Sequence, residues 1–104
     1  MDSQVQIEVM DEQRVGTVTH FFSKLRVATV RLEQPVAVGD RIHVRGRVDD
    51  FKVKVRSMQV NHKPVERAEP GMEVGILVGT KAHEGDEVLK VEQGKSWWSR
   101  LLGA

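Results

Sequence analysis

The sequence contains no cysteine and few aromatic or proline residues. Its 104 residues include no cysteine and no tyrosine, and only three prolines, three phenylalanines and two tryptophans. Without cysteine the chain can form neither a disulfide nor a thiolate site. No apolar run approaches the ~20 residues that a membrane-spanning helix needs. The length fits one domain, and the 39% of hydrophobic residues is enough for a modest core.

The N-terminal residues show no targeting feature. They read Met-Asp-Ser-Gln-Val-Gln and have neither the basic start nor the apolar core of a secretory signal. We therefore expect a cytoplasmic protein that has no membrane partner.

Charge is unevenly distributed along the chain. The formal net charge is only +1, yet residues 14–60 carry ten Lys or Arg against four acids. Residues 1–13 carry four acids and no Lys or Arg, and residues 61–92 carry seven acids against four bases. A basic middle of this kind is typical of proteins with an anionic partner, although every small domain also needs a charged surface.

Residues 38–59 alternate between apolar and polar side chains, which predicts two strands joined by a short turn. The apolar members are Ile42, Val44, Phe51, Val53 and Val55. The cationic members and one histidine are Arg41, His43, Arg45, Arg47, Lys52, Lys54 and Arg56. Because successive side chains of a strand point to opposite faces, one face of this hairpin should be buried and the other basic.

Similar runs recur at intervals of about ten residues, separated by turn signals such as Glu69-Pro70-Gly71. Strands are predicted at residues 14–22, 25–32, 41–47, 51–60, 65–68, 72–78 and 87–91. Two Gly-Asp pairs, at residues 39–40 and 85–86, both stand in a turn just before a strand. This pattern predicts an all-β sandwich or closed barrel.

The chain divides into three segments. Residues 1–13 are an N-terminal arm or extra strand, residues 14–92 the β-barrel, and residues 93–104 a Trp-rich C-terminal tail or short helix. In a helical tail, Trp97 and Trp98 would pair at i,i+4 with Leu101 and Leu102. Such an apolar surface can dock on its own barrel, contact a protein partner or second copy, or, as the weakest alternative, lie on a membrane.

The order of several short segments resembles a known family. The segments are Val15-Gly16-Thr17-Val18, Val38-Gly39-Asp40-Arg41-Ile42, Gly46, Val55-Arg56-Ser57-Met58-Gln59 and Ala68-Glu69-Pro70-Gly71-Met72-Glu73-Val74-Gly75-Ile76. The chain resembles the β-barrel second domain of translational GTPases such as elongation factor Tu and initiation factor two. It looks more like the small stand-alone translation elongation factor-like proteins. These in turn are similar to the C-terminal barrel of the collagenase-like peptidase family, some members of which act in RNA hydroxylation.

The resemblance, which covers about residues 14–92, implies a six-stranded closed Greek-key barrel. No P-loop domain is present, so the chain is not itself a GTPase. Elongation factor Tu holds the aminoacyl end of tRNA partly through a Gly-Arg-Val-Glu-Arg-Gly type segment. This chain has His20-Phe21-Phe22-Ser23-Lys24-Leu25 at that place, and no tRNA contact is transferred to it.

The residues together predict a non-catalytic binding module that engages RNA or a ribonucleoprotein through the basic hairpin face. Lys and Arg on a sheet can contact successive phosphates. Two observations favour the alternative of a merely solvated outer surface. Edge strands are often protected by such cations, and no side chain on this face except His43 offers a base a stacking platform. The alternative function is a protein–protein adaptor or homo-oligomer that uses the Trp-rich tail.

Other chemistries are not expected. The four histidines, at positions 20, 43, 62 and 83, show no ligand spacing, so we predict no metal site and no cofactor. No nucleophile-elbow or metalloprotease motif is present, and the chain is predicted not to be an enzyme or to bind a small-molecule substrate.

Overall fold

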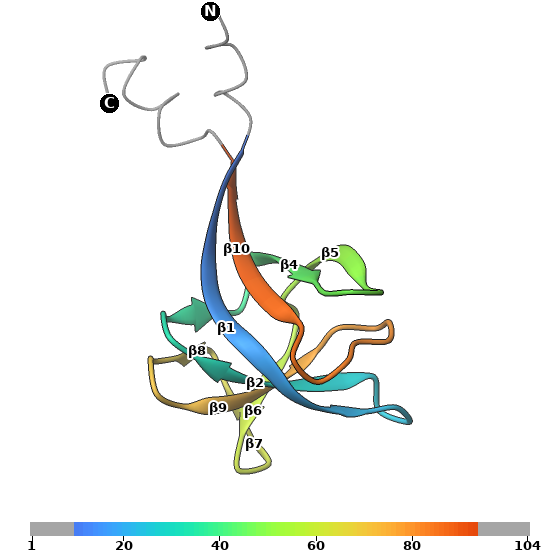
Figure 1. Ribbon diagram of the computed structural model, residues 1–104. Helices are drawn as coiled ribbons and strands as arrows, with labels where there is room; N and C mark the ends of the chain where they lie inside the picture. Colours follow the sequence, from blue (N-terminus) through green and yellow to red (C-terminus); the bar gives the residue numbers. More distant parts are fainter. Residues whose placement is uncertain (1–9, 94–104) are drawn as a thin grey trace, which may run out of the picture.

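The computed structural model describes residues 10–93, with side chains for residues 12–91, and these residues form an all-β fold. The strands are β1 (Met10–Phe22), β2 (Val27–Leu32), β3 (Val36–Ala37), β4 (Arg41–Arg45), β5 (Asp50–Lys54), β6 (Met58–Val60), β7 (Lys63–Val65), β8 (Arg67–Ala68), β9 (Glu73–Leu77) and β10 (Glu87–Gln93). One antiparallel sheet has the order β5-β4-β10-β1-β2-β9-β6-β7, and β3 pairs with β8 (Figure 1). The predicted all-β class is confirmed.

Strand β1 belongs to both halves of the sheet. Its first part runs beside β10 and its second part beside β2 (Figure 1). The register shifts between Arg14 and Gly16 on one side, and between Val18 and His20 on the other. Such irregularities bend a strand and increase its twist, which lets one strand pass from one half of the fold to the other.

The sheet curls until its two ends meet. β5 lies at one end of the strand order and β6 near the other, yet only residues 55–57 separate them in the chain. A link of this length spans at most about 14 Å when fully extended. This link is hydrogen-bonded on both sides, because Gly39 N donates to Val55 O at 2.8 Å and Leu77 N donates to Ser57 O at 3.2 Å.

The connection by residues 55–57 differs from the predicted six-stranded closed ring. Among the described residues, the strand pairings run in an open order and no ladder joins β5 to β7. The predicted strand at residues 51–60 is split into β5 and β6 by this link. The chain itself, rather than a continuous ladder, brings the two ends of the sheet together.

The core is built almost entirely from aliphatic side chains. Its members include Val15, Val18, Val30, Leu32, Val36, Ile42, Val44, Val55, Met58, Val74, Ile76 and Val88. Phe21 and Phe51 pack at the margin of this cluster and are only partly buried. A sequence poor in aromatics thus fills its interior with β-branched residues, which suit a pleated surface.

Two turns with the same design precede β4 and β10. Gly39 and Gly85 both have positive φ angles, of 101° and 94°, which favour glycine. The aspartate that follows each glycine reaches back to a backbone N–H three residues earlier, from Ala37 N to Asp40 Oδ2 and from His83 N to Asp86 Oδ2, both at 2.9 Å. The repeated Gly-Asp pair of the sequence therefore marks a repeated, aspartate-capped turn.

The paired strands extend slightly beyond residues 14–92, since β1 is described from Met10 and β10 to Gln93. The predicted tail, with Trp97, Trp98, Leu101 and Leu102, lies outside the described residues, as does most of the predicted arm. Within the described range no helix is long and apolar enough to cross a membrane.

Candidate functional site

The predicted hairpin of residues 38–59 is present as the β4–β5 pair. Arg41 lies opposite Lys54, and His43 opposite Lys52. Directly opposite residues share a face of the sheet, so the cations of the two strands lie together. The other face carries Ile42 and Val44, which are fully buried.

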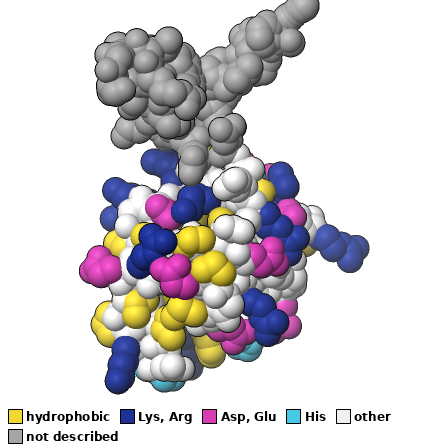
Figure 2. Space-filling view, turned by 90° about the vertical axis from the view of Figure 1, so that its left-hand side faces the viewer, with side chains coloured by type: hydrophobic (Ala, Val, Ile, Leu, Met, Phe, Trp, Pro, Cys, Tyr) yellow, Lys and Arg dark blue, Asp and Glu magenta, His cyan; other side chains and the backbone are white. Residues whose placement is uncertain are grey.

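Neighbouring strands bring carboxylates to the cationic side of the hairpin. β10 pairs with β4 and places Glu87 opposite Arg45, where Arg45 Nη2 lies 3.1 Å from Glu87 Oε1. Arg14 of β1 lies 3.6 Å from the other oxygen of Glu87. The hairpin face therefore carries both positive and negative charges. The side of the molecule shown in Figure 2 is also mixed, with Lys and Arg lying among Asp and Glu.

His43 is buried on this side of the sheet, with only 7% of its surface exposed. Its Nδ1 lies 3.0 Å from Glu12 Oε1, and its Nε2 lies 2.5 Å from Asp50 Oδ1. Carboxylates only accept hydrogen bonds, so both ring nitrogens must carry a proton to satisfy both partners. Burial acts to lower the pKa of His43, but the hydrogen bonds to Glu12 and Asp50 outweigh it and raise the pKa above the ordinary value.

The bridge between Glu12, His43 and Asp50 predicts a pH-dependent contribution to stability. Because the pKa of His43 is raised in the folded state, this contribution is complete below about pH 6.5 and is lost as pH rises through the folded-state pKa. We expect His43→Gln to lower the free energy of unfolding by roughly 1–3 kcal/mol at pH 5.5, and by less at pH 9. Urea unfolding at both pH values measures this difference.

A matched control for His43 is available in the turn that follows β6. His62 is exposed and has a positive φ of 65°, which asparagine tolerates. His62→Asn should leave the pH dependence of unfolding unchanged. An equal cost of His43→Gln at pH 5.5 and pH 9 would show that the charged bridge does not contribute.

The remaining predicted cations are spread over four places. Arg41 and Lys54 face each other across β4 and β5, and neither has an ion pair with a described side chain. Arg47 lies in the β4–β5 loop, beside a pocket, and Arg56 lies in the link between β5 and β6. Lys52 lies 4.0 Å from Glu12, which also binds His43.

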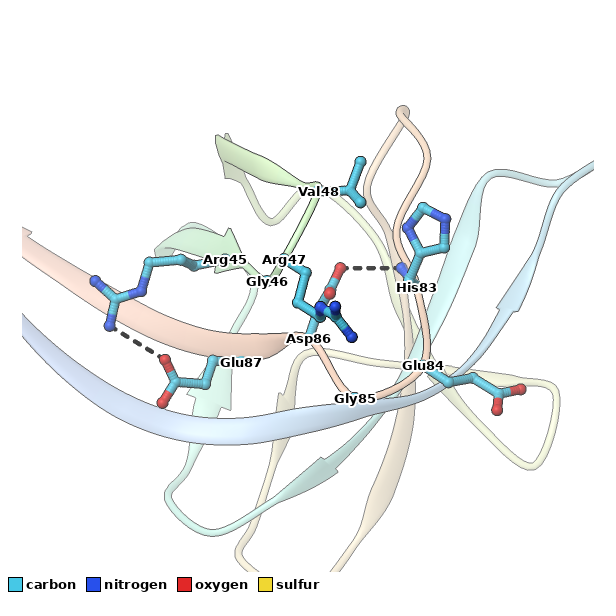
Figure 3. A pocket seen from close by; sticks show the side chains of 9 residues that line it. All are labelled: Arg45, Gly46, Arg47, Val48, His83, Glu84, Gly85, Asp86 and Glu87. Atoms are coloured by element: carbon cyan, nitrogen blue, oxygen red, sulfur yellow. Dashed lines mark hydrogen bonds and ion pairs between the residues drawn. The ribbon is translucent and has the colours of Figure 1, made fainter.

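A pocket of about 840 Å³ opens between the β4–β5 loop and the loop that precedes β10. Its lining residues are Arg45, Gly46, Arg47, Val48, His83, Glu84, Gly85, Asp86 and Glu87 (Figure 3). Val48 is 79% exposed at the rim. In Figure 3 the Arg47 and Asp86 side chains lie at the centre of the view, and Glu84 points away from them.

Three polar side chains from the two loops meet beside this pocket. Asp49 and His83 are joined by a contact of 2.6 Å between Asp49 Oδ2 and His83 Nδ1. Burial and a hydrogen bond with Asp49 raise the pKa of Asp86, whereas the same hydrogen bond lowers the pKa of Asp49. Asp86 is only 4% exposed, so the two carboxyl groups lie against each other in a largely buried place.

The group formed by Asp49, His83 and Asp86 was not predicted from the sequence. Asp49 and His83 are 34 residues apart, and histidine spacing alone cannot reveal such a group. A partial signal was present, since Asp86 belongs to the second Gly-Asp pair and the first Gly-Asp pair is followed by a strand in the same way.

The chain is similar in sequence to part of one longer curated protein. No family model matches the chain. An uncharacterized protease of Methanocaldococcus jannaschii is 35% identical over 80 residues, which is 76% of this chain and 20% of that protein. The chain thus spans about a fifth of the length of the curated relative that it matches.

Two solved structures with the same fold come from one putative peptidase. The C-terminal domain of a putative U32 peptidase from Geobacillus thermoleovorans superposes with a TM-score of 0.70 at 17% identity, covering 75% of this chain and 91% of that domain. Its selenomethionine variant gives 0.69 at 16% identity, covering 73% and 96%. These matches support the resemblance to the C-terminal barrel of the collagenase-like peptidase family, and they do not support an identity as a translation factor.

Proposed function

We propose that the chain is a non-catalytic binding module, related to the C-terminal barrel of U32 peptidases, that engages RNA or a ribonucleoprotein in the cytoplasm. The matched structures are C-terminal domains, and the protease relative has about five times the length that this chain spans. A module that supplies binding beside a separate catalytic part fits this arrangement.

The observation that carries the RNA proposal is the like-charge pair formed by Arg41 and Lys54. The two residues are direct cross-strand partners, and like charges in that position destabilise a sheet. On β4 and β5 themselves the other cationic side chains have acidic neighbours, since Glu12 lies near His43 and Lys52 and Glu87 lies near Arg45. A phosphate bound between Arg41 and Lys54 would relieve their repulsion and accept hydrogen bonds from both.

Binding of single-stranded RNA at several salt concentrations tests this proposal. Each phosphate contact contributes a slope of about 0.7 to the plot of log K against log salt for single strands. Replacing both Arg41 and Lys54 with glutamine should therefore make the slope shallower by about 1.4 and weaken binding at low salt. Fluorescence anisotropy with a labelled oligonucleotide measures both quantities.

The matched control removes the same charge elsewhere. Lys24 lies in the turn after β1 and Lys63 in β7, and both are exposed. The Lys24→Gln, Lys63→Gln double variant should keep the wild-type salt slope. No binding by the wild-type protein at low salt, or equal losses in the two double variants, would rule out the hairpin as an RNA site.

A protein partner is the second candidate function, and exposed apolar side chains favour it. Phe22 and Leu25, at the β1–β2 turn, are 46% and 62% exposed, and both line a shallow groove of about 300 Å³. The predicted contribution of the Trp-rich tail remains a prediction. Size-exclusion chromatography of the protein used for the RNA titration distinguishes the two functions. A dimer without RNA affinity favours the adaptor, and a monomer that binds RNA favours the first proposal.

A further inference from the structure

We propose that Asp49, His83 and Asp86 form a binding site for a divalent transition-metal ion of the zinc type. This site is separate from the Arg41–Lys54 pair and does not depend on RNA binding. One ligand atom from each residue lies within 4.8 Å of the other two. Ligand atoms 2.0–2.2 Å from one ion are at most about 4.4 Å apart, so the three atoms lie near the spacing that one ion requires.

The backbone holds the two loops in place. Asp86 O accepts a hydrogen bond from Val18 N at 2.9 Å, and Gly85 N donates to Val18 O at 2.8 Å. On the other side, Gly46 N donates to Asp49 O at 2.8 Å and closes the β4–β5 loop. A site between two anchored loops requires little reordering when an ion binds, which favours affinity.

Asp86 brings a buried carboxyl group to this site, next to a second acid. Asp86 is only 4% exposed, and its Oδ2 accepts a hydrogen bond from His83 N. The neighbour that faces the rest of this carboxyl group is Asp49, another acid. Two carboxylates cannot meet in a buried place unless a proton or a cation lies between them. A metal ion would satisfy both, with a ring nitrogen of His83 as the third ligand.

The room for this carboxyl group is set by Gly46. A Cβ atom at this position would overlap Asp86 Oδ1, so glycine is what allows the β4–β5 loop to lie so close to Asp86. The adjacent pocket is lined by His83 and Asp86 and gives an ion free positions for water or an anionic ligand. Zinc sites with three protein ligands keep a further position for water or another ligand.

The ligand set selects the kind of metal. Imidazole nitrogen with carboxylate oxygen suits zinc and similar first-row ions, whereas calcium and magnesium prefer oxygen ligands alone. We therefore expect Zn²⁺ and Co²⁺ to bind and Mg²⁺ to bind far more weakly.

Isothermal titration of the tag-free protein with ZnCl₂, together with thermal unfolding in the presence and absence of the metal, tests the site. His83→Ala and Asp49→Asn should each weaken zinc binding by at least about 10- to 100-fold, the loss seen even for outer-shell partners of metal sites. Because an ion that binds only the folded state stabilises it, zinc should raise the Tm of the wild type and not that of these variants. Co²⁺ should give visible absorption bands that disappear in the same variants.

Two further variants separate a built site from general attraction to charge. His62→Asn removes an exposed histidine in the turn before β7, a strand that does not pair with β4, β5 or β10, and should keep wild-type affinity. Lys81 lies near Asp49 and acts on its charge, so Lys81→Gln should tighten zinc binding. Absence of zinc binding, equal binding of Mg²⁺, or wild-type affinity in both His83→Ala and Asp49→Asn would overturn the proposal.

Discussion

Replacing Gly16 with alanine should lower the free energy of unfolding by about 3 kcal/mol, at the upper end of what overpacking costs. Gly16 pairs on one side with Leu32 of β2 and on the other with Val88 of β10. A Cβ atom there would overlap the carbonyl oxygen of Arg31 and lie 2.8 Å from Val30 Cγ1. The added Cβ atom conflicts mainly with the backbone of Arg31. Backbone cannot move away by a change of rotamer, so β1 and β2 must separate.

The measurement for Gly16→Ala is chemical denaturation with a thermal scan. In a domain of this size each kcal/mol shifts the Tm by about 4–8 °C, so a shift on the order of 15 °C is expected. Gly75→Ala is the matched control, because a Cβ atom there meets Val27 Cγ1 at 3.3 Å and Gln59 Cγ at 3.4 Å, which are side-chain rather than backbone atoms and lie farther away. Its cost should stay below about 1 kcal/mol, since alanine also restricts the unfolded chain. Equal costs would contradict the proposed role of the β2 backbone.

Gly46→Ala should have the second large effect, about 2–3 kcal/mol. The added Cβ would overlap Asp86 Oδ1. Asp86 cannot turn away freely, because it holds the hydrogen bond from His83 N that closes the turn before β10. The substitution therefore either breaks the turn or displaces the β4–β5 loop, and either change also disturbs the pocket between the two loops.

A double-mutant cycle with Asp86→Ala isolates the cause. If Gly46 is required only because it makes room for Asp86, then Gly46→Ala should cost less than about 1 kcal/mol in the Asp86→Ala background, a coupling within the usual range for contacting residues. Asp40 holds the same position in the turn before β4 and provides the control, since Asp40→Ala and Gly46→Ala should be additive. Additivity of Gly46→Ala with Asp86→Ala would locate the conflict elsewhere.

Much of the fold could be predicted from local pattern. The alternation of Ile42 and Val44 with their polar neighbours predicts the buried face of β4. Both side chains are fully buried in the structure. The two Gly-Asp pairs gave two turns of one geometry because glycine allows positive φ and aspartate caps the turn through its own carboxylate. Both signals act within a few residues, so a single sequence contains them.

The break at residues 55–57 was missed for a different reason. Phe51, Val53 and Val55 continue one alternating series, and nothing local separates the strand that pairs with β4 from the strand that pairs with β9. The chain leaves β5 at Lys54 because the sheet has curled and the next partner, β9, lies at its other end. That is a property of the whole sheet.

The basic hairpin face shows most clearly which properties are local to the sequence and which depend on the whole fold. By itself the sequence determined that Arg41, His43 and Arg45 share one side of a strand, because strand periodicity is a local property. Only the tertiary structure decided that Glu12 and Glu87 lie against that side, where Glu12 binds His43 and Glu87 pairs with Arg45. Pairing of β4 with β10, and of β10 with β1, brings together residues more than 30 positions apart. Electrostatic energy depends on distance in space rather than in sequence. The strand pattern alone therefore indicates a uniformly cationic surface, whereas the folded chain has a surface of mixed charge.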